Sequence, residues 1–110
     1  MISLNNIFSL DDYVYNEKNE FFKPLFQNEY IRIEKIVSEG HCSPPDFWYD
    51  QEENEWVLLL QGKAKLKFQN TNEIIELNPG EFILIEPHIK HRVEWTTPNE
   101  KTIWLAFFFK

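Results

Sequence analysis

The sequence predicts a single all-β domain in which short antiparallel strands form a two-sheet sandwich or a small barrel. From Phe21 to the end of the chain, apolar and polar residues alternate with the period of two that marks half-buried strands. Turn-forming groups such as Asn78-Pro79-Gly80 separate these segments about every 8–12 residues, a spacing typical of sandwiches and small barrels. No linker or internal repeat is apparent, so we expect one domain over residues 1–110.

The first twenty residues differ from the rest because they are mixed and polar, with no sustained alternation. We expect residues 1–20 to form an N-terminal arm and residues 21–110 to form the barrel. Within the arm, Ser9-Leu10-Asp11-Asp12 predicts the start of one helical turn, since serine and aspartate favour helix beginnings.

Seven segments are predicted as strands from their alternation and their β-branched or aromatic content. They are residues 31–37, 55–60, 63–68, 74–77, 82–85, 91–96 and 102–109. The clearest is Lys63-Ala64-Lys65-Leu66-Lys67-Phe68, which places three lysines on one face and three apolar side chains on the other.

Two of these strands carry predictions about their faces. Phe82–Ile85 is apolar on both faces, so we expect cover on both sides. His91, Val93 and Trp95 should share one face of the following strand, because side chains alternate along a strand.

Residues 50–60 admit an alternative, because Glu52, Trp56 and Leu59 could lie on an amphipathic helix. Gly62 and the alternating segment after it favour a hairpin instead.

Charge and cysteine content exclude several function classes. The net charge of −7 argues against a nucleic-acid or anionic-membrane partner, since both attract clusters of Lys and Arg. Cys42 is the only cysteine, so no disulfide forms within the chain, and neighbouring His41 should point the opposite way rather than activate its thiol. No basic leader or membrane-length apolar stretch is present, and we expect a cytoplasmic protein.

Polar residues that point into a barrel near its mouth are candidates for chemistry. Asp50, Glu55, His88 and His91 are the four that the strand assignment brings to this region. Carboxylate and imidazole ligands suit Zn²⁺, Fe²⁺ or Mn²⁺. A single histidine on an apolar strand also has a structural interpretation, in which Glu55 hydrogen-bonds His91 across the interior.

Two stretches resemble the sequence motifs of the cupin family. Glu55 and Gly62 match the second half of G-x5-H-x-H-x3–4-E-x6-G, and the stretch from Gly80 to His91 is similar to G-x5-P-x-G-x2-H-x3-N with its spacing kept as far as the histidine. From about Phe21 onward the chain looks like the small single-domain bacterial cupins. The resemblance implies a jelly-roll β-barrel, also described as a double-stranded β-helix.

The chain departs from these motifs at several ligand positions. Asp50 and Trp48 stand where the family has two histidines, and only Glu55 and His91 remain of the usual four ligands. The resemblance therefore implies a divalent metal (Zn, Fe, Mn or Ni) held by Asp50, Glu55 and His91, with water completing the coordination.

Four further residues are predicted to contact a small-molecule ligand. They are Trp48, Gln51, His88 and Trp95. Aromatic side chains at a barrel mouth can stack on a flat or sugar-like ligand, although these tryptophans could equally fill the core.

Three functions remain open from the sequence. The chain could be a metal-dependent enzyme acting on a small molecule, a non-catalytic binding or sensing module, or a structural dimerising domain. The apolar strands at residues 82–85 and 104–109 offer more apolar surface than one interior can take, so we also expect a symmetric homodimer.

Overall fold

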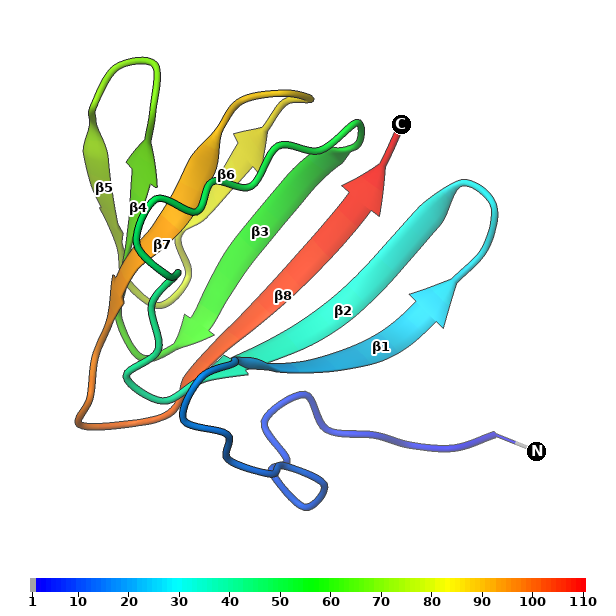
Figure 1. Cartoon of the computed structure of the whole chain (residues 1–110). Helices are drawn as coiled ribbons and strands as arrows, with labels where there is room; N and C mark the ends of the chain where they lie inside the picture. The colour runs from blue at the N-terminus through cyan, green and yellow to red at the C-terminus, as the bar shows by residue number, and fades with distance from the viewer. Residues whose placement is uncertain (1) are drawn as a thin grey trace.

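The computed structural model describes residues 2–110 and contains eight strands and no helix in that range (Figure 1). The strands are β1 (Phe21–Gln27), β2 (Ile31–Ser38), β3 (Asn54–Gln61), β4 (Ala64–Phe68), β5 (Ile74–Leu77), β6 (Phe82–Ile85), β7 (His91–Thr96) and β8 (Thr102–Phe109). All strand pairings are antiparallel, and the predicted all-β class is confirmed. The described residues include no helix long and apolar enough to cross a membrane.

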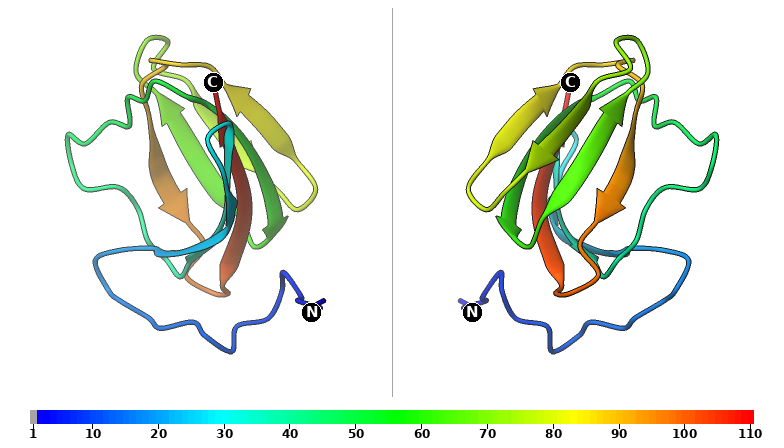
Figure 2. Two further views of the ribbon diagram at one scale, coloured as in Figure 1. Left: turned by 90° about the vertical axis from the view of Figure 1, so that its right-hand side faces the viewer. Right: turned by 90° about the vertical axis from the view of Figure 1, so that its left-hand side faces the viewer.

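The strands form two sheets that face each other, as the side views in Figure 2 show. The larger sheet has the order β1-β2-β8-β3-β6, and the smaller has the order β5-β4-β7. Side chains from the facing surfaces build one core, which includes Val57 and Leu59 of β3, Leu66 of β4 and Ile85 of β6. The hydrophobic core therefore lies between the sheets and surrounds the interior where a site was predicted.

The alternation in the sequence located most strands closely. The bounds of β5, β6 and β8 are those predicted, and the buried face of β4 consists of Ala64, Leu66 and Phe68, as expected. Residues 54–61 form a strand, so the alternative of an amphipathic helix over residues 50–60 is wrong. Strand β3 pairs with β6 on one edge and with β8 on the other, and these pairings favour a strand over a helix.

Strand β1 has no counterpart among the predicted segments. It is an edge strand that pairs only with β2, and its register shifts between Pro24 and Phe26. Proline cannot donate a hydrogen bond to a neighbouring strand and is tolerated at edges and bulges. The proline and the register shift both interrupt the regular alternation from which strands are predicted.

The helical turn predicted at Ser9–Asp12 is wrong. The arm instead makes two tight turns, closed by hydrogen bonds from the Ser9 amide to the Asn6 carbonyl and from the Tyr13 amide to the Leu10 carbonyl, each 3.0 Å long. The Asn6 side chain also accepts a 2.8 Å bond from the Phe8 amide. Such side-chain bonds to nearby backbone compete with helix formation.

Gly62, the last residue of the first motif, has a geometric role. Its φ is +91°, and a Cβ built on it would lie 2.2 Å from Oγ1 and 2.7 Å from Cα of Thr102. The turn between β3 and β4 therefore crosses the start of β8 so closely that only glycine fits.

An irregularity in β7 changes which residues face inward. The register with β4 shifts between Lys65 and Leu66, so Val93 pairs with inward-facing Leu66 whereas Trp95 pairs with outward-facing Lys65. The Lys65 ammonium lies 5.2 Å from the centroid of the Trp95 ring. The predicted common face is correct for His91 and Val93 and wrong for Trp95, because an extra residue in the strand reverses the alternation.

The outer surface of the larger sheet is strongly apolar. Strand registry aligns one row of side chains across all five strands: Phe26, Ile33, Phe107, Trp56 and Leu84. On β6, Phe82 is 62% exposed and Leu84 is 52% exposed. Within the single chain, β6 is therefore covered on one face only, and the expected cover on its second face is absent from residues 2–110.

Candidate functional site

A cavity of about 70 Å³ lies between the two sheets. Its volume corresponds to roughly five water molecules. Most of its wall is apolar and comes from both sheets: Phe22, Ile36, Val57, Leu66, Ile85, Val93, Trp104 and Phe108. Five polar residues complete the lining: Glu20, Tyr49, Gln51, Glu55 and His91. A mostly apolar cavity with a few converging polar groups is the usual form of a small-molecule site.

Glu55 and His91 meet inside this cavity. Glu55 stands near the start of β3, His91 begins β7, and their side chains approach to 3.3 Å between Oε1 and Nε2. Only 4% of the His91 side chain and 13% of the Glu55 side chain are exposed. The predicted contact across the interior is therefore present in the structure.

The hydrogen bonds of His91 determine its charge. Its Nδ1 donates to the Ile89 carbonyl at 2.9 Å, so a neutral imidazole would present a bare Nε2 lone pair to the Glu55 carboxylate. A proton on Nε2 removes that repulsion. Burial lowers the pKa of His91, but the bonds to Glu55 and to the Ile89 carbonyl, together with the Glu55 charge, outweigh it and raise the pKa above the ordinary value of 6.5.

Tyr49 lies directly against this pair. Its backbone forms an isolated antiparallel bridge with His91, and the two rings stack with centroids 5.5 Å apart. Burial, reinforced by the charges of Glu20 and Glu55, raises the pKa of Tyr49 to about 12. The phenol is therefore protonated at neutral pH and can donate a hydrogen bond to a guest in the cavity.

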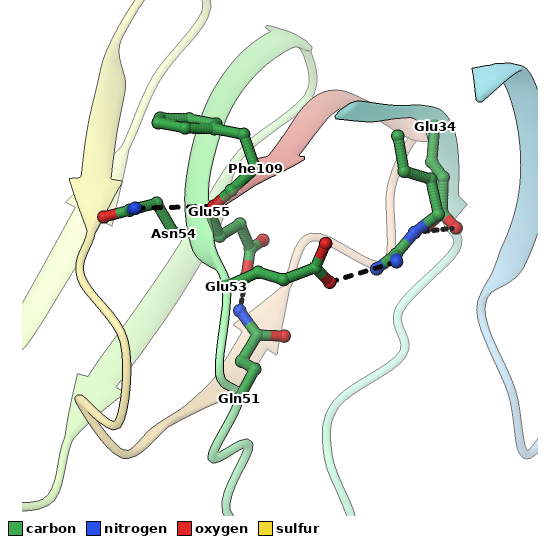
Figure 3. Close-up of polar contacts among 7 residues, drawn as sticks. Glu34, Gln51, Glu53, Asn54, Glu55 and Phe109 are labelled. Atoms are coloured by element: carbon green, nitrogen blue, oxygen red, sulfur yellow. Dashed lines mark hydrogen bonds and ion pairs between the residues drawn. The ribbon is translucent and has the colours of Figure 1, made fainter. Parts of the chain in front are cut away.

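Gln51 holds the Glu55 carboxylate. Its side-chain nitrogen donates to Glu55 Oε1 at 2.9 Å, and Figure 3 shows the amide directed at that oxygen. The same oxygen faces His91, so a single carboxylate oxygen is held from two sides. Gln51, predicted as a ligand contact, thus lies in the cavity wall and also positions Glu55.

Glu20 is a polar residue of the cavity that the sequence analysis missed. It is the last residue before β1, and its Oε2 accepts a hydrogen bond from the Ser38 hydroxyl, whose oxygen in turn accepts the indole N–H of Trp104 at 3.0 Å. Burial raises the pKa of Glu20 above its ordinary value despite the Ser38 bond. The sequence placed Glu20 in a polar arm, and nothing local indicates a contact with a residue eighteen positions later.

Asp50 and His88 lie outside the cavity. They bond each other at 2.8 Å between Oδ1 and Nδ1, with side chains 41% and 64% exposed. Asp50 follows inward-facing Tyr49, so the extended backbone turns its carboxylate outward. His88 occupies the glycine position of the second motif and retains a left-handed backbone, with φ at +63°.

The two tryptophans predicted to contact a ligand also lie away from the cavity. Trp48 is half-buried in the segment before β3 but is not part of the lining, and Trp95 lies on the outer side of the smaller sheet beside Lys65. Tyr49 and Gln51 occupy the inward positions of that segment instead. Motif spacing located the segment correctly but not the side chains that point inward.

The donor atoms do not fit a resident divalent ion. Catalytic zinc centres use about three protein ligands, and structural ones use four. Within residues 2–110, no three His, Cys, Asp or Glu side chains are placed to hold one ion. Glu55 and His91 converge, but Asp50 is bonded to His88 on the outside, so the predicted three-ligand set is not assembled.

Comparisons with known proteins agree with this architecture. The model of the cupin domain family matches residues 35–108. A crystal structure from Ralstonia eutropha JMP134, named "putative mannose-6-phosphate isomerase", superimposes with a TM-score of 0.89 at 34% identity and covers 99% of each chain. No curated protein matches the chain significantly.

Two more distant structures share the fold. A cupin superfamily protein of Desulfitobacterium hafniense DCB-2 has a TM-score of 0.70 at 18% identity, over 87% of this chain and 82% of that one. Fe(II) HppE has a TM-score of 0.66 at 16% identity, over 80% of this chain and 48% of that one. With two packed antiparallel sheets, a hollow interior and a family match over residues 35–108, the chain belongs to the cupin family.

Proposed function

We propose that this cupin binds a small organic molecule in the cavity between its sheets. The observation that carries the proposal is the buried Glu55–His91 pair facing a mostly apolar cavity. Buried polar groups need partners, and this pair has them within the chain, from Gln51 and from the Ile89 carbonyl. The cavity beside the pair leaves room for a guest to contact the second Glu55 oxygen and the other polar groups of the wall.

The polar residues divide into anchors and a positioning group. Glu55, paired with His91 through one carboxylate oxygen, offers its other oxygen as a charged acceptor, and the Tyr49 hydroxyl adds a donor beside it. Gln51 fixes the carboxylate by its 2.9 Å bond and acts as a positioning residue. A paired carboxylate and imidazole can also pass a proton to or from a bound molecule, so the arrangement is compatible with acid–base chemistry.

A bound divalent ion is the alternative that the cupin motifs favour. It would use Glu55 and His91, whose converging donor atoms are the one observation in its support. The two proposals differ in a direct measurement, metal content after incubation with Zn²⁺, Fe²⁺, Mn²⁺ or Ni²⁺ followed by gel filtration. We expect sub-stoichiometric metal, because two side-chain ligands give too weak a site. One equivalent that is lost in Glu55→Gln and kept in Asp50→Asn would establish the metal site instead.

The binding proposal is tested with three-carbon probes that enter a small cavity: propylammonium, 1-propanol and propionate. Trp104 lines the cavity, and its indole N–H bonds Ser38, so the indole resonance in ¹⁵N-labelled protein reports on occupancy. We expect at least one probe to shift this resonance saturably. Val93→Leu, which adds a methylene to the cavity wall, should weaken that binding.

Asp50→Asn is the control, because it changes a residue that lies outside the cavity. Saturable binding that is unchanged in Asp50→Asn and weakened in Val93→Leu supports the proposal. Absence of a shift with all three probes, or shifts insensitive to Val93→Leu, would overturn it.

A further inference from the structure

The charges around the cavity suggest which class of molecule it accepts. Two carboxylates, Glu20 and Glu55, are part of the lining, and no Lys or Arg is among the described residues that form it. The only cationic group is His91, whose charge is already matched by Glu55. The Glu55–His91 ion pair is neutral as a unit. The polar groups that remain are the Glu20 carboxyl, the Tyr49 hydroxyl and the Glu55 oxygen that does not contact His91.

The nearest arginine on the inner side of the larger sheet is not free to neutralise an anion. Arg32 donates to Glu34 and to Glu53, each at 3.1 Å, and its guanidinium lies 4.2 Å from the ring centroid of Phe108. Figure 3 draws the dashed contacts of Glu53 and Glu34 in the same view as the contact between Gln51 and Glu55. The approach to the cavity near Phe108 is therefore acidic as well.

Aromatic rings form much of the remaining wall. Phe22, Tyr49, Trp104 and Phe108 line the cavity together with the two carboxylates. Aromatic faces attract organic cations, and the attraction is stronger where water is excluded. Carboxylates and aromatic rings around one small cavity are the chemistry that recognises an ammonium group, whereas a phosphate needs Lys, Arg or a cluster of backbone N–H donors.

We infer that the molecule bound in this cavity carries a protonated amine, and that its ammonium group lies between Glu20 and Glu55 with its carbon chain against the aromatic wall. This inference rests on the proposed function, since it names the ligand class of the same cavity. It also separates this chain from a role in binding phosphorylated sugars, which the name of the Ralstonia eutropha relative would suggest.

The state of Glu20 supplies a second, measurable consequence. Burial raises the pKa of Glu20, so this carboxyl keeps its proton to higher pH than an exposed glutamate does. The titratable groups that face it are His41 and Glu55, with the hydroxyls of Ser38 and Tyr49 beside them. A cation arriving next to Glu20 stabilises its ionised form, so binding should release a fraction of a proton to the buffer.

The experiment compares propylammonium, 1-propanol and propionate by calorimetric titration at neutral pH and constant salt, with mannose 6-phosphate and inorganic phosphate as further probes. We expect propylammonium to bind about tenfold more tightly than 1-propanol, since a charge-assisted hydrogen bond contributes more than a neutral one. Glu20→Gln should remove this preference by weakening the binding of propylammonium. Asp50→Asn should alter neither affinity.

Proton release is measured by repeating the propylammonium titration in two buffers with different ionisation enthalpies. The apparent enthalpies should differ for the natural sequence and agree for Glu20→Gln. Equal affinities for propylammonium and 1-propanol, or tightest binding of propionate or of either phosphate compound, would overturn the amine assignment and leave the cavity as a binding site. Absence of binding by every probe would instead overturn the proposed function itself.

Discussion

Nε2 of His91 lies 3.3 Å from Oε1 of Glu55, and both side chains are almost entirely withdrawn from solvent. Each group lowers the free-energy cost of burying the other, because an unpaired charge in this position would destabilise the fold. The same two residues are the ligand positions of the cupin motifs that this chain has kept. Their pairing determines how folding stability should depend on pH.

Glu55→Gln should reverse the pH dependence that comes from His91. In the natural sequence the pKa of His91 is raised in the folded state, so the stability it adds is complete below 6.5 and is lost as pH rises through the folded pKa. Without the carboxylate, burial dominates and lowers this pKa, so stability should fall as pH drops below 6.5. Urea unfolding over a pH series, with Asp50→Asn as control, measures the difference. Parallel curves for both proteins would contradict the assignment.

Glu20→Gln should stabilise the protein at neutral pH. A carboxyl with a raised folded pKa binds more protons folded than unfolded, so stability falls as pH rises from the ordinary value of 4.5 through the folded pKa. Glutamine keeps an oxygen for the Ser38 hydroxyl and has nothing to ionise. Thermal unfolding at several pH values should show that the decline is smaller in this variant. Glu17→Gln, in an exposed part of the same arm, should leave the decline unchanged.

Gly62→Ala should be far more damaging than Gly80→Ala. Both glycines have φ near +90°, so both substitutions strain the backbone, at a cost of about 1–3 kcal/mol. Only at Gly62 would the new Cβ also collide with Thr102, whereas at Gly80 nothing lies within 4 Å. We expect Gly62→Ala to lose at least about 2 kcal/mol more than Gly80→Ala in urea unfolding, an overpacking cost. Equal losses would show that the collision is relieved by movement of β8.

A second copy of the chain should cover the outer face of the larger sheet. The row Phe26, Ile33, Phe107, Trp56 and Leu84 is uncharged, whereas the chain as a whole carries −7, so like-charge repulsion between two copies is weakest at this face. Light scattering should give about twice the 13.3 kDa of one chain. Trp56 packs on both Phe82 and Phe107 in this face, which makes it a preformed aromatic surface.

The dimer has a matched pair of test variants. Leu84→Glu places a charge on the proposed interface and should yield single chains, whereas Ile74→Glu changes an equally exposed residue on β5 of the other sheet and should not. The natural sequence scattering as a single chain at micromolar concentration would refute the second copy. So would dimers that persist in Leu84→Glu.

The sequence predicted most of the strands and the central pair of the site, but not the complete cavity. Short apolar or alternating runs between turns are local signals, and they defined β5, β6, β7 and β8 to the residue. The orientation of Trp95 depends on the register between β4 and β7, which a single sequence does not contain. For the same reason, the motif positions suggested Asp50, whereas the backbone turns Tyr49 and Gln51 into the cavity.

The cavity wall has two origins. Glu55 comes from β3, which is paired on both edges, and His91 begins β7; both side chains are nearly buried, so changing them puts the core at risk. Glu20 and Phe22 reach the same space from the junction of the arm with an edge strand, where few core contacts depend on them. Substitutions at this junction could therefore change which ligand a relative binds without altering the strands that carry Glu55 and His91. Ligand specificity and folding stability would then evolve on separate segments of one short chain.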